Sequence, residues 1–169
     1  GSPLYAVPLD MKGAYDSVPW TQLDDSLRRL DVPEAAITTV RWTLQGARRV
    51  VASAYGTQAE AEATCLENGI PQGCTSSPAL WVVALDKAIS LVERHGGKGY
   101  TLPGVGEIRI LAFADDCWLV SSSRAELQKS VQAFSLAAGA DGIRISAKKS
   151  FYTYAPRGGC AAWRAGEGA

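Results

Sequence analysis

The sequence has 169 residues and a mass of 17.9 kDa, the size of one ordinary domain, which argues against a second large one. Hydrophobic residues make up 47% and charged residues 20%, a composition that excludes a disordered or collagen-like chain. The 17 basic side chains balance 17 acidic ones, so the formal net charge is zero. Any nucleic-acid binding must therefore depend on a local patch rather than on the whole surface.

The first half of the chain predicts one strand, two helices and a hairpin. Hydrophobic spacing gives these elements in order: a strand at 4–9, helices at 20–30 and 33–44, and strands at 48–55 and 63–66 joined by a turn. Asp10 stands where the first strand ends. The break between the two helices is Asp31-Val32-Pro33, and Gly46 is a stop signal after the second helix.

The second half predicts a mixture of helices and strands without strict alternation. Its elements are a helix at 77–93, hairpin strands at 108–114 and 117–121, a helix at 124–138, and a strand pair near 143–145 and 150–154. Four tryptophans in apolar patterns are expected in the core: Trp20, Trp42, Trp81 and Trp118. We therefore expect an α+β fold, with antiparallel strands and helices packed on one face.

The spacing of the cysteines and the length of the apolar runs indicate in which cellular compartment the protein is expected. The cysteines stand far apart, without a Cys-x-x-Cys pair: Cys65, Cys74, Cys117 and Cys160. This pattern fits neither a zinc site nor a disulfide framework, and it favours buried free thiols in an intracellular protein. The longest apolar run, 79–85, is too short to span a bilayer and no signal peptide is visible, so no membrane partner is expected.

Carboxylates stand at two places where apolar residues are expected. Asp10 ends a strand, and Asp115-Asp116 interrupts an apolar hairpin with no basic residue within five positions of Asp115. Burying an unpaired charge is costly, so a cation from elsewhere is an attractive partner. Two Mg²⁺ ions held by carboxylates can activate a hydroxyl and stabilise the leaving oxygen in phosphoryl transfer. Taken alone, an Asp pair in a turn more often serves local hydrogen bonding.

A second candidate is the loop Gly69-Ile70-Pro71-Gln72-Gly73, which leads into a helix through Ser76-Ser77-Pro78. Its glycines permit close backbone approach, and the amide of Gln72 can both donate and accept hydrogen bonds. With a helix N-terminus following, the segment suits holding a phosphate or a base. The competing interpretation is a helix entry loop with Ser and Thr caps, which is the better one if the loop is taken alone.

Taken together, these segments resemble the conserved blocks of reverse transcriptases. Residues 10–16 (DMKGAYD) resemble the first carboxylate motif, and 69–73 (GIPQG) with Ser77-Pro78 resemble the second block. Residues 113–116 (FADD) resemble the third, and their Phe-Ala form indicates the non-LTR (LINE-type) retrotransposon enzymes. Residues 142–146 (GIRIS), leading to Lys149, resemble the fourth, with Ser146 where the family usually has Asn. Four blocks in the family's order make the match specific.

The resemblance implies a polymerase palm with a ferredoxin-like sheet, working as an RNA-directed DNA polymerase in retrotransposition. Two Mg²⁺ ions, replaceable by Mn²⁺, would be ligated by Asp10 and Asp115 with help from the backbone carbonyl of Met11. Asp116 would be catalytic too, but it is the weaker ligand candidate because adjacent strand residues point to opposite faces, and it could serve only to support the turn.

The resemblance also assigns residues to the incoming deoxynucleotide. Tyr15 would exclude a ribose 2′-hydroxyl, Gln72 would contact the nucleotide, and Gly73 would leave room for the template or the nucleotide. Lys149 would protonate or steady the leaving pyrophosphate, with Lys148 as an adjacent rival. Core packing is the alternative role for Tyr15, and a solvated surface position is the alternative for either lysine.

The palm is expected over residues 3–155, after a possible expression scar at 1–2 and before a poorly ordered tail at 156–169. By the family's order, fingers would precede the first motif and a thumb would follow the palm. Both are expected to be missing here, so the fragment should be inactive alone. The expected partners are an RNA template, a DNA primer and deoxynucleoside triphosphates, with a nuclear parent protein. A non-catalytic scaffold binding RNA or protein, or another two-metal enzyme such as a nucleotidyl cyclase, remains an alternative.

Overall fold

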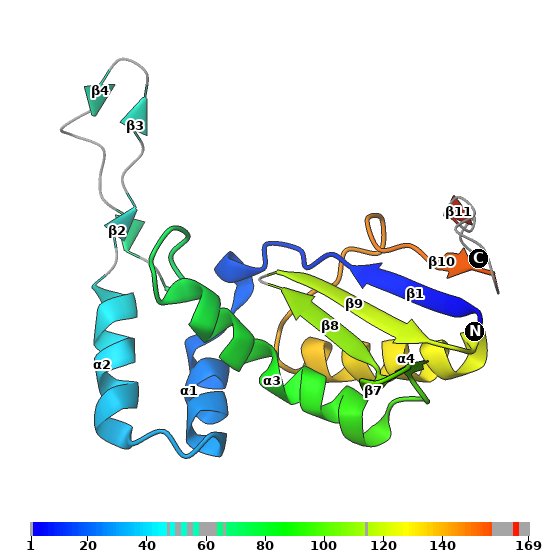
Figure 1. The fold of residues 1–169 in the computed structure, drawn as a ribbon. Coiled ribbons are helices and arrows are strands. Elements are labelled where there is room, and N and C mark those ends of the chain that lie inside the picture. The colour runs from blue at the N-terminus through cyan, green and yellow to red at the C-terminus, as the bar shows by residue number, and fades with distance from the viewer. Residues whose placement is uncertain are drawn as a thin grey trace.

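A computed structural model of the chain describes residues 2–46, 48–49, 52–53, 56–57, 64–65, 67–113, 115–156 and 164–165. Its main layer is an antiparallel sheet in the order β11-β10-β1-β9-β8 (Figure 1). The strands are β1 (Leu4–Leu9), β8 (Ile110–Phe113), β9 (Asp116–Ser121), β10 (Thr153–Ala155) and β11 (Arg164–Ala165). The first strand of the chain therefore lies in the middle of the sheet, between two strands from its second half.

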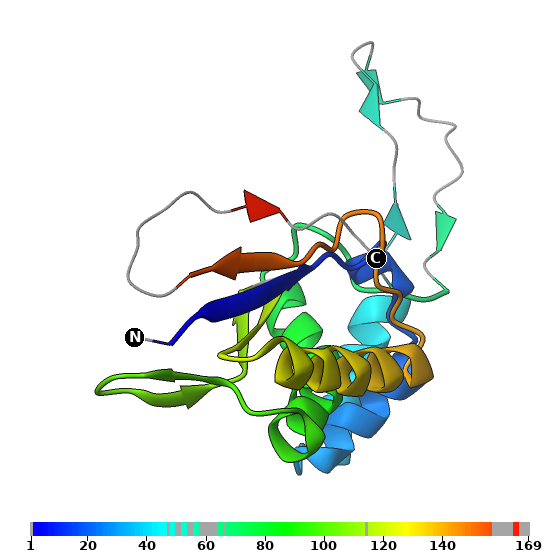
Figure 2. The same cartoon turned by 90° about the vertical axis from the view of Figure 1, so that its right-hand side faces the viewer.

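Helices form the second layer. They are α1 (Trp20–Arg29), α2 (Glu34–Gln45), α3 (Ser77–His95) and α4 (Arg124–Ala140), preceded by a short 3₁₀ turn, η1 (Tyr15–Ser17). Helices α3 and α4 pack against each other and cover one face of the sheet, as the turned view shows (Figure 2). Helices α1 and α2 form a hairpin beside α3 (Figure 1). This arrangement confirms the predicted α+β fold with helices on one face.

Three small two-stranded ladders complete the described structure. They join β2 (Arg48–Arg49) to β5 (Thr64–Cys65), β3 (Ala52–Ser53) to β4 (Gly56–Thr57), and β6 (Tyr100–Leu102) to β7 (Gly106–Ile108). Most of the predicted hairpin at 48–66 lies outside the described residues. Within it, β4 falls in the segment predicted as a turn, and β6–β7 was not predicted at all.

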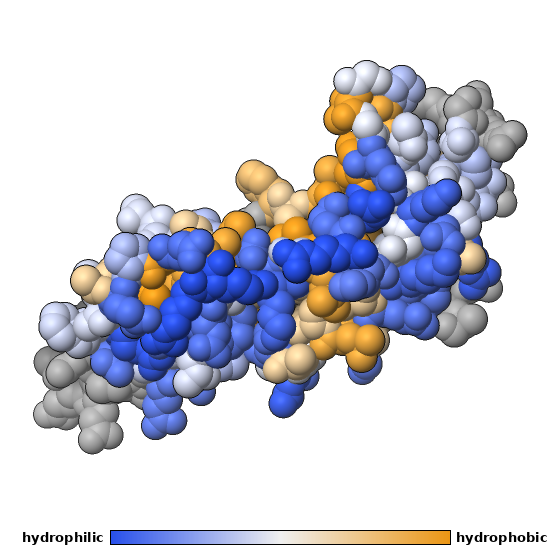
Figure 3. Space-filling view, turned by 90° about the horizontal axis from the view of Figure 1, so that it is seen from below, coloured by the Kyte–Doolittle hydropathy of each residue, from blue (hydrophilic) through white to orange (hydrophobic). Residues whose placement is uncertain are grey.

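The core lies between the sheet and the two long helices. Alternation along β9 buries Cys117, Leu119 and Ser121 on the helix side, and Leu9 of β1 pairs with Cys117. Trp81 of α3 and Phe134 of α4 are fully buried against this face. Seen from below, the helical side shows mostly hydrophilic surface broken by separate apolar patches (Figure 3). The helices are thus amphipathic: their apolar sides pack against the sheet, and their polar sides face the solvent.

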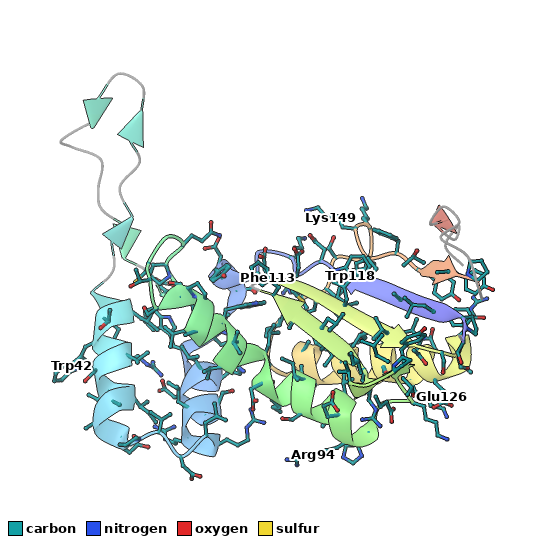
Figure 4. The ribbon with its side chains drawn as sticks, viewed as in Figure 1. Trp42, Arg94, Phe113, Trp118, Glu126 and Lys149 are labelled. Carbon is teal, nitrogen blue, oxygen red and sulfur yellow. The ribbon has the colours of Figure 1, made fainter. Side chains whose placement is uncertain are left out.

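Two of the four tryptophan predictions were wrong. Trp20 and Trp81 are buried, but Trp42 is 71% exposed and points away from α2 (Figure 4). Helix α2 buries Ile37 and Leu44, seven residues apart, and Trp42 lies off that stripe. Trp118 lies on the open face of the sheet because its neighbours Cys117 and Leu119 both point to the core.

The predicted strand pair near 143–145 and 150–154 was also wrong as a pair. Ile145 bridges Met11, and Thr153–Ala155 forms β10 beside β1. Both segments therefore pair with the first strand region instead of with each other, because the edge of β1 opposite β9 offers them free backbone donors and acceptors.

Two further predictions concern the burial of the cysteines and the absence of a membrane span. Cys117 is buried as predicted, whereas Cys74 is exposed, and the Cys65 and Cys160 side chains lie outside the described residues. Cys74 is exposed because it stands in the loop before α3 and not in an apolar element. Across the described ranges, no helix combines the length and apolar character that a bilayer crossing would need.

Candidate active site

Asp10 stands at the end of β1, where two chain segments close around it. Its backbone N–H donates to Ser150 Oγ at 3.2 Å, and its carbonyl oxygen accepts from the Ser146 N–H at 2.8 Å. Lys149 Nζ lies 3.5 Å from Asp10 Oδ1, with the two side chains 72% and 38% exposed. An ion pair this open to water stabilises the fold by about 1 kcal/mol at most. Its value is therefore positional: it brings a cation beside the carboxylate.

Asp115 and Asp116 reach the same end of the sheet through the β8–β9 hairpin. Asp116 opens β9 opposite Phe113, and Asp115 stands in the turn just before it. Leu9 pairs with Cys117 and both are buried, so alternation places their neighbours Asp10 and Asp116 on the open side of the sheet. Asp116 thus shares the face of Asp10, while Asp115 approaches from the turn, and both remain candidate ligands.

Met11 supplies backbone rather than a side chain. Its side chain is buried in the core, and it forms an antiparallel bridge with Ile145. The hydrogen bonds flanking this bridge run from Lys12 N–H to Arg144 O and from Ser146 N–H to Asp10 O. In this pattern the N–H and C=O of Met11 turn to the other edge of the chain, the side of β9. Its carbonyl is therefore directed toward the strand that carries Asp116.

The two carboxylates of the hairpin act on the buried thiol next to them. Burial, and after it the negative charges of Asp116 and Asp115, raise the pKa of Cys117 to about 11. Among the described residues, no three His, Cys, Asp or Glu side chains are grouped closely enough to enclose a metal ion. The exposed carboxylates still suit Mg²⁺, because this ion keeps several waters and commonly binds one or two carboxylates plus substrate phosphates.

A cavity of about 320 Å³ opens beside the Asp115 turn. It is lined by Tyr15, Gln72, Gly73, Cys74, Ser77, Pro78 and Asp115. This volume lies at the lower end of the range for small-molecule sites. All three residues predicted to contact a nucleotide thus meet one predicted metal ligand, although Asp10 is not part of this lining. Cys74, one residue beyond the end of the GIPQG block, also lines the cavity, which its sequence did not predict.

The loop at 69–73 is tied directly to the segment after Asp10. The Ile70 N–H donates to Tyr15 O at 2.7 Å, and the Gly69 N–H donates to Val18 O at 2.9 Å. Gly69 has a φ of +86°, and a Cβ there would lie 2.8 Å from Asp16 O. This close approach requires glycine, so the first residue of the block serves to join two motifs.

Tyr15 lies both at the cavity wall and against the core. It lines the cavity, and its ring packs on Trp81 of α3 with centroids 5.6 Å apart. The loop opposite is held by Ser77, whose Oγ donates to Pro71 O at 2.5 Å. Packing on Trp81 therefore holds the ring at the cavity wall.

Lys149 and Lys148 differ in what they reach. Lys149 lies near Asp10, whereas Lys148 is exposed and has no ion-pair partner among the residues the structure describes. Lys149 projects above the end of the sheet in Figure 4. The structure thus brings Lys149, and not its neighbour, to the Asp10 carboxylate.

Most of the chain matches a known protein family. A family model described as reverse transcriptase (RNA-dependent DNA polymerase) matches residues 1–160. The Pol polyproteins of the type-1 retrotransposable element R2 from Popillia japonica and Nasonia vitripennis are each 28% identical, over 144 and 148 residues. These alignments cover 85% and 86% of this chain but 20% and 14% of the relatives.

Solved structures show the same fold at lower identity. Telomerase from Candida tropicalis in complex with a TWJ fragment of telomeric RNA matches with a TM-score of 0.65 and 16% identity, over 93% of this chain and 27% of the other. The apo enzyme from the same organism, truncated at its C-terminal domain, matches with a TM-score of 0.63 and 15% identity, covering 95% and 32%. The expected palm architecture and the expected resemblance to LINE-type enzymes are both confirmed.

Proposed function

Because the chain belongs to the reverse transcriptase (RNA-dependent DNA polymerase) family, we propose that it is the catalytic palm of an RNA-directed DNA polymerase. The observation that carries the proposal is the arrival of Asp10 and the Asp115 turn at one end of the sheet, beside a cavity lined by Tyr15 and Gln72. The chain spans 20% and 14% of its R2 relatives, so the activity proposed is that of the parent protein.

In this proposal Asp10 and Asp115 hold two Mg²⁺ ions, with the Met11 carbonyl as a further ligand and Asp116 in support. When bound, such ions lower the pKa of an attacking hydroxyl and stabilise the leaving oxygen of a phosphoryl transfer. The protein's own part is to fix the two carboxylates, through the β1–β9 pairing and the hydrogen bonds of Ser146 and Ser150. Phosphoryl transfer depends mainly on such positioning and electrostatics.

The cavity would receive the deoxynucleotide. Tyr15, held by Trp81, excludes a 2′-hydroxyl by bulk, Gln72 contacts the nucleotide, and Gly73 leaves space for it. Lys149 lies near Asp10, where it can steady or protonate the leaving pyrophosphate. These roles combine the family resemblance with the positions of the side chains.

The proposed partners are an RNA template and a DNA primer. R2 relatives are Pol polyproteins of a retrotransposable element, and one structural neighbour was solved with telomeric RNA. Retrotransposition is therefore the proposed setting, in a nuclear parent protein in which residues 3–155 work with fingers and a thumb.

Metal binding by the purified chain tests the proposal. Addition of Mn²⁺ should broaden the amide NMR signals of residues near 10, 11 and 115, with an affinity on the order of millimolar. Asp10→Asn and Asp115→Asn should each remove the effect, while Asp25→Asn, an exposed acid on α1, should leave it unchanged.

Broadening centred on Glu60, Glu62 and Glu67 would contradict the proposed site. RNA binding by the chain that needs no divalent ion, and is unchanged in Asp115→Asn, would favour the scaffold alternative instead. RNA-templated primer extension by the parent protein, abolished by the same substitution, is the expected result.

A further inference from the structure

The segment after Asp10 runs antiparallel to residues 144–146. Met11 bridges Ile145, the Lys12 N–H donates to Arg144 O at 2.7 Å, and the Ser146 N–H donates to Asp10 O at 2.8 Å. These bonds set Lys12 directly opposite Arg144, one step from the bridge. Two cations that are far apart in the sequence are thereby brought opposite each other beside an isolated bridge.

Alternation decides which way these side chains face. Met11 is buried in the core and Ile145 packs against it, so the residues on either side of the bridge point to the open face. Lys12 and Arg144 are both exposed, in agreement with this. Asp10 is two residues before Lys12 and lies on the same face. The pair is thus next to the proposed catalytic carboxylate.

The arrangement is electrostatically unfavourable as it stands. Like charges directly opposite each other, with Cβ atoms about 5 Å apart, destabilise an antiparallel pair. Within the described part of the chain, neither Lys12 nor Arg144 has an acidic partner. Several other cations of this neutral protein, though not all, have acidic partners: Arg28, Arg29, Arg41, Lys87, Arg109 and Lys129. A negative group from outside the chain would remove the repulsion.

We propose that Lys12 and Arg144 form a binding site for the phosphate groups of the polyphosphate end of a nucleotide, or of released pyrophosphate. This proposal rests on the proposed polymerase function. It adds two cations to the open face of the sheet, next to Asp10. A guanidinium offers paired N–H donors to phosphate oxygens, and an ammonium offers a point charge. Phosphates of a nucleic-acid backbone have the same chemistry, but the position beside Asp10 favours the polyphosphate.

Binding of inorganic pyrophosphate and tripolyphosphate to the purified chain, without divalent ions, tests this site. NMR titration should shift the signals of Lys12, Arg144 and their neighbours. The double variant Lys12→Gln/Arg144→Gln should weaken binding about tenfold or more, as expected for two hydrogen bonds to a charged group. The matched control is Lys98→Gln/Arg94→Gln, which removes the same charges elsewhere. Arg94 lies on the helical side of the molecule, away from Lys149 (Figure 4).

Three outcomes separate the possibilities. Equal loss of binding in the control double variant, or none in the Lys12/Arg144 variant, would overturn the proposal. Selective loss of binding to a short RNA–DNA duplex, with pyrophosphate binding unchanged, would overturn it in favour of backbone phosphates. The assay contains no metal, so a negative result would not bear on the Mn²⁺ test of the carboxylates. Failure of this site and failure of the proposed function can therefore be told apart. The melting temperature of the double variant should equal or exceed that of wild type, since the repulsion is removed.

Discussion

Trp20 donates its indole N–H to the carbonyl oxygen of Gly69 across 2.7 Å, in a buried hydrogen bond between residues 49 positions apart. The bond joins the first turn of α1 to the loop that precedes α3. Together with the Ile70–Tyr15 and Gly69–Val18 backbone bonds, it holds one wall of the cavity against the other. These three hydrogen bonds therefore help to set the spacing between Tyr15 and Gln72.

Trp20→Phe should destabilise the chain by about 1–3 kcal/mol, because the Gly69 carbonyl would remain buried without its donor. Denaturant unfolding measured by circular dichroism would report the change. Trp42→Phe is the matched control: Trp42 is exposed and should change stability by less than about 0.5 kcal/mol. Equal effects at the two positions would show that the indole bond contributes little.

Alanine substitutions at Gly69 and Gly73 separate two effects: the strain of a positive φ and the steric clash of a Cβ with neighbouring atoms. Both have positive φ, +86° and +88°, so alanine is strained at either position by about 1–2 kcal/mol. A Cβ at Gly69 also meets Asp16 O at 2.8 Å, whereas nothing lies within 4 Å at Gly73. Gly69→Ala should therefore lower the unfolding midpoint clearly more than Gly73→Ala. Matching losses would mean that the close approach of the two motifs is relaxed in solution.

The two described thiols should differ sharply in reactivity. Hydrogen bonding by Ser76 lowers the pKa of Cys74, while burial raises the pKa of Cys117 to about 11. Since the thiolate is the nucleophile, Cys74 should be alkylated rapidly at about pH 8 and Cys117 only after unfolding. Mass spectrometry of a Cys65→Ser/Cys160→Ser background would follow both. Rapid labelling of Cys117 would indicate that the hairpin opens readily.

Tyr15→Ala should raise ribonucleotide incorporation relative to deoxynucleotide incorporation in the parent polymerase, because the ring acts by bulk at the cavity wall. Tyr15→Phe keeps the ring and its packing on Trp81, so it should preserve the selectivity. Competitive primer extension with both nucleotide types measures the ratio. An unchanged ratio in an active Tyr15→Ala enzyme would leave packing as the role of this residue.

Local sequence signals predicted the helices that begin or end at proline or glycine. Pro33 and Gly46 bound α2, and Pro78 stands in the first turn of α3, as expected. The strand predicted at 4–9 is β1. The four motif blocks also indicated which side chains would meet. What they could not give is pairing between distant segments, such as Ile145 with Met11, because no local pattern specifies the partner of a strand.

Burial was predicted less well than secondary structure. Trp42 and Trp118 are large and apolar, yet exposed, because face is set by packing partners and not by residue type. The same holds for Lys12 and Arg144, which are brought opposite each other by backbone hydrogen bonds between the first and fourth motifs. Motif resemblance names residues one block at a time, so a pair formed across two blocks is visible only in three dimensions.

The central place of β1 has a consequence for how the chain folds. Its neighbours β9 and β10 come from the second half of the sequence, and Asp10 bonds to Ser150, 140 positions later. Contacts of such long sequence separation slow folding, because the loop-closure entropy must be lost before they form. During synthesis β1 can therefore pair with its neighbours only after most of the domain has emerged, whereas α1 and α2 can pack together early. Substitutions in the α1–α2 hairpin should change the early folding steps, and those around Asp10 the last ones.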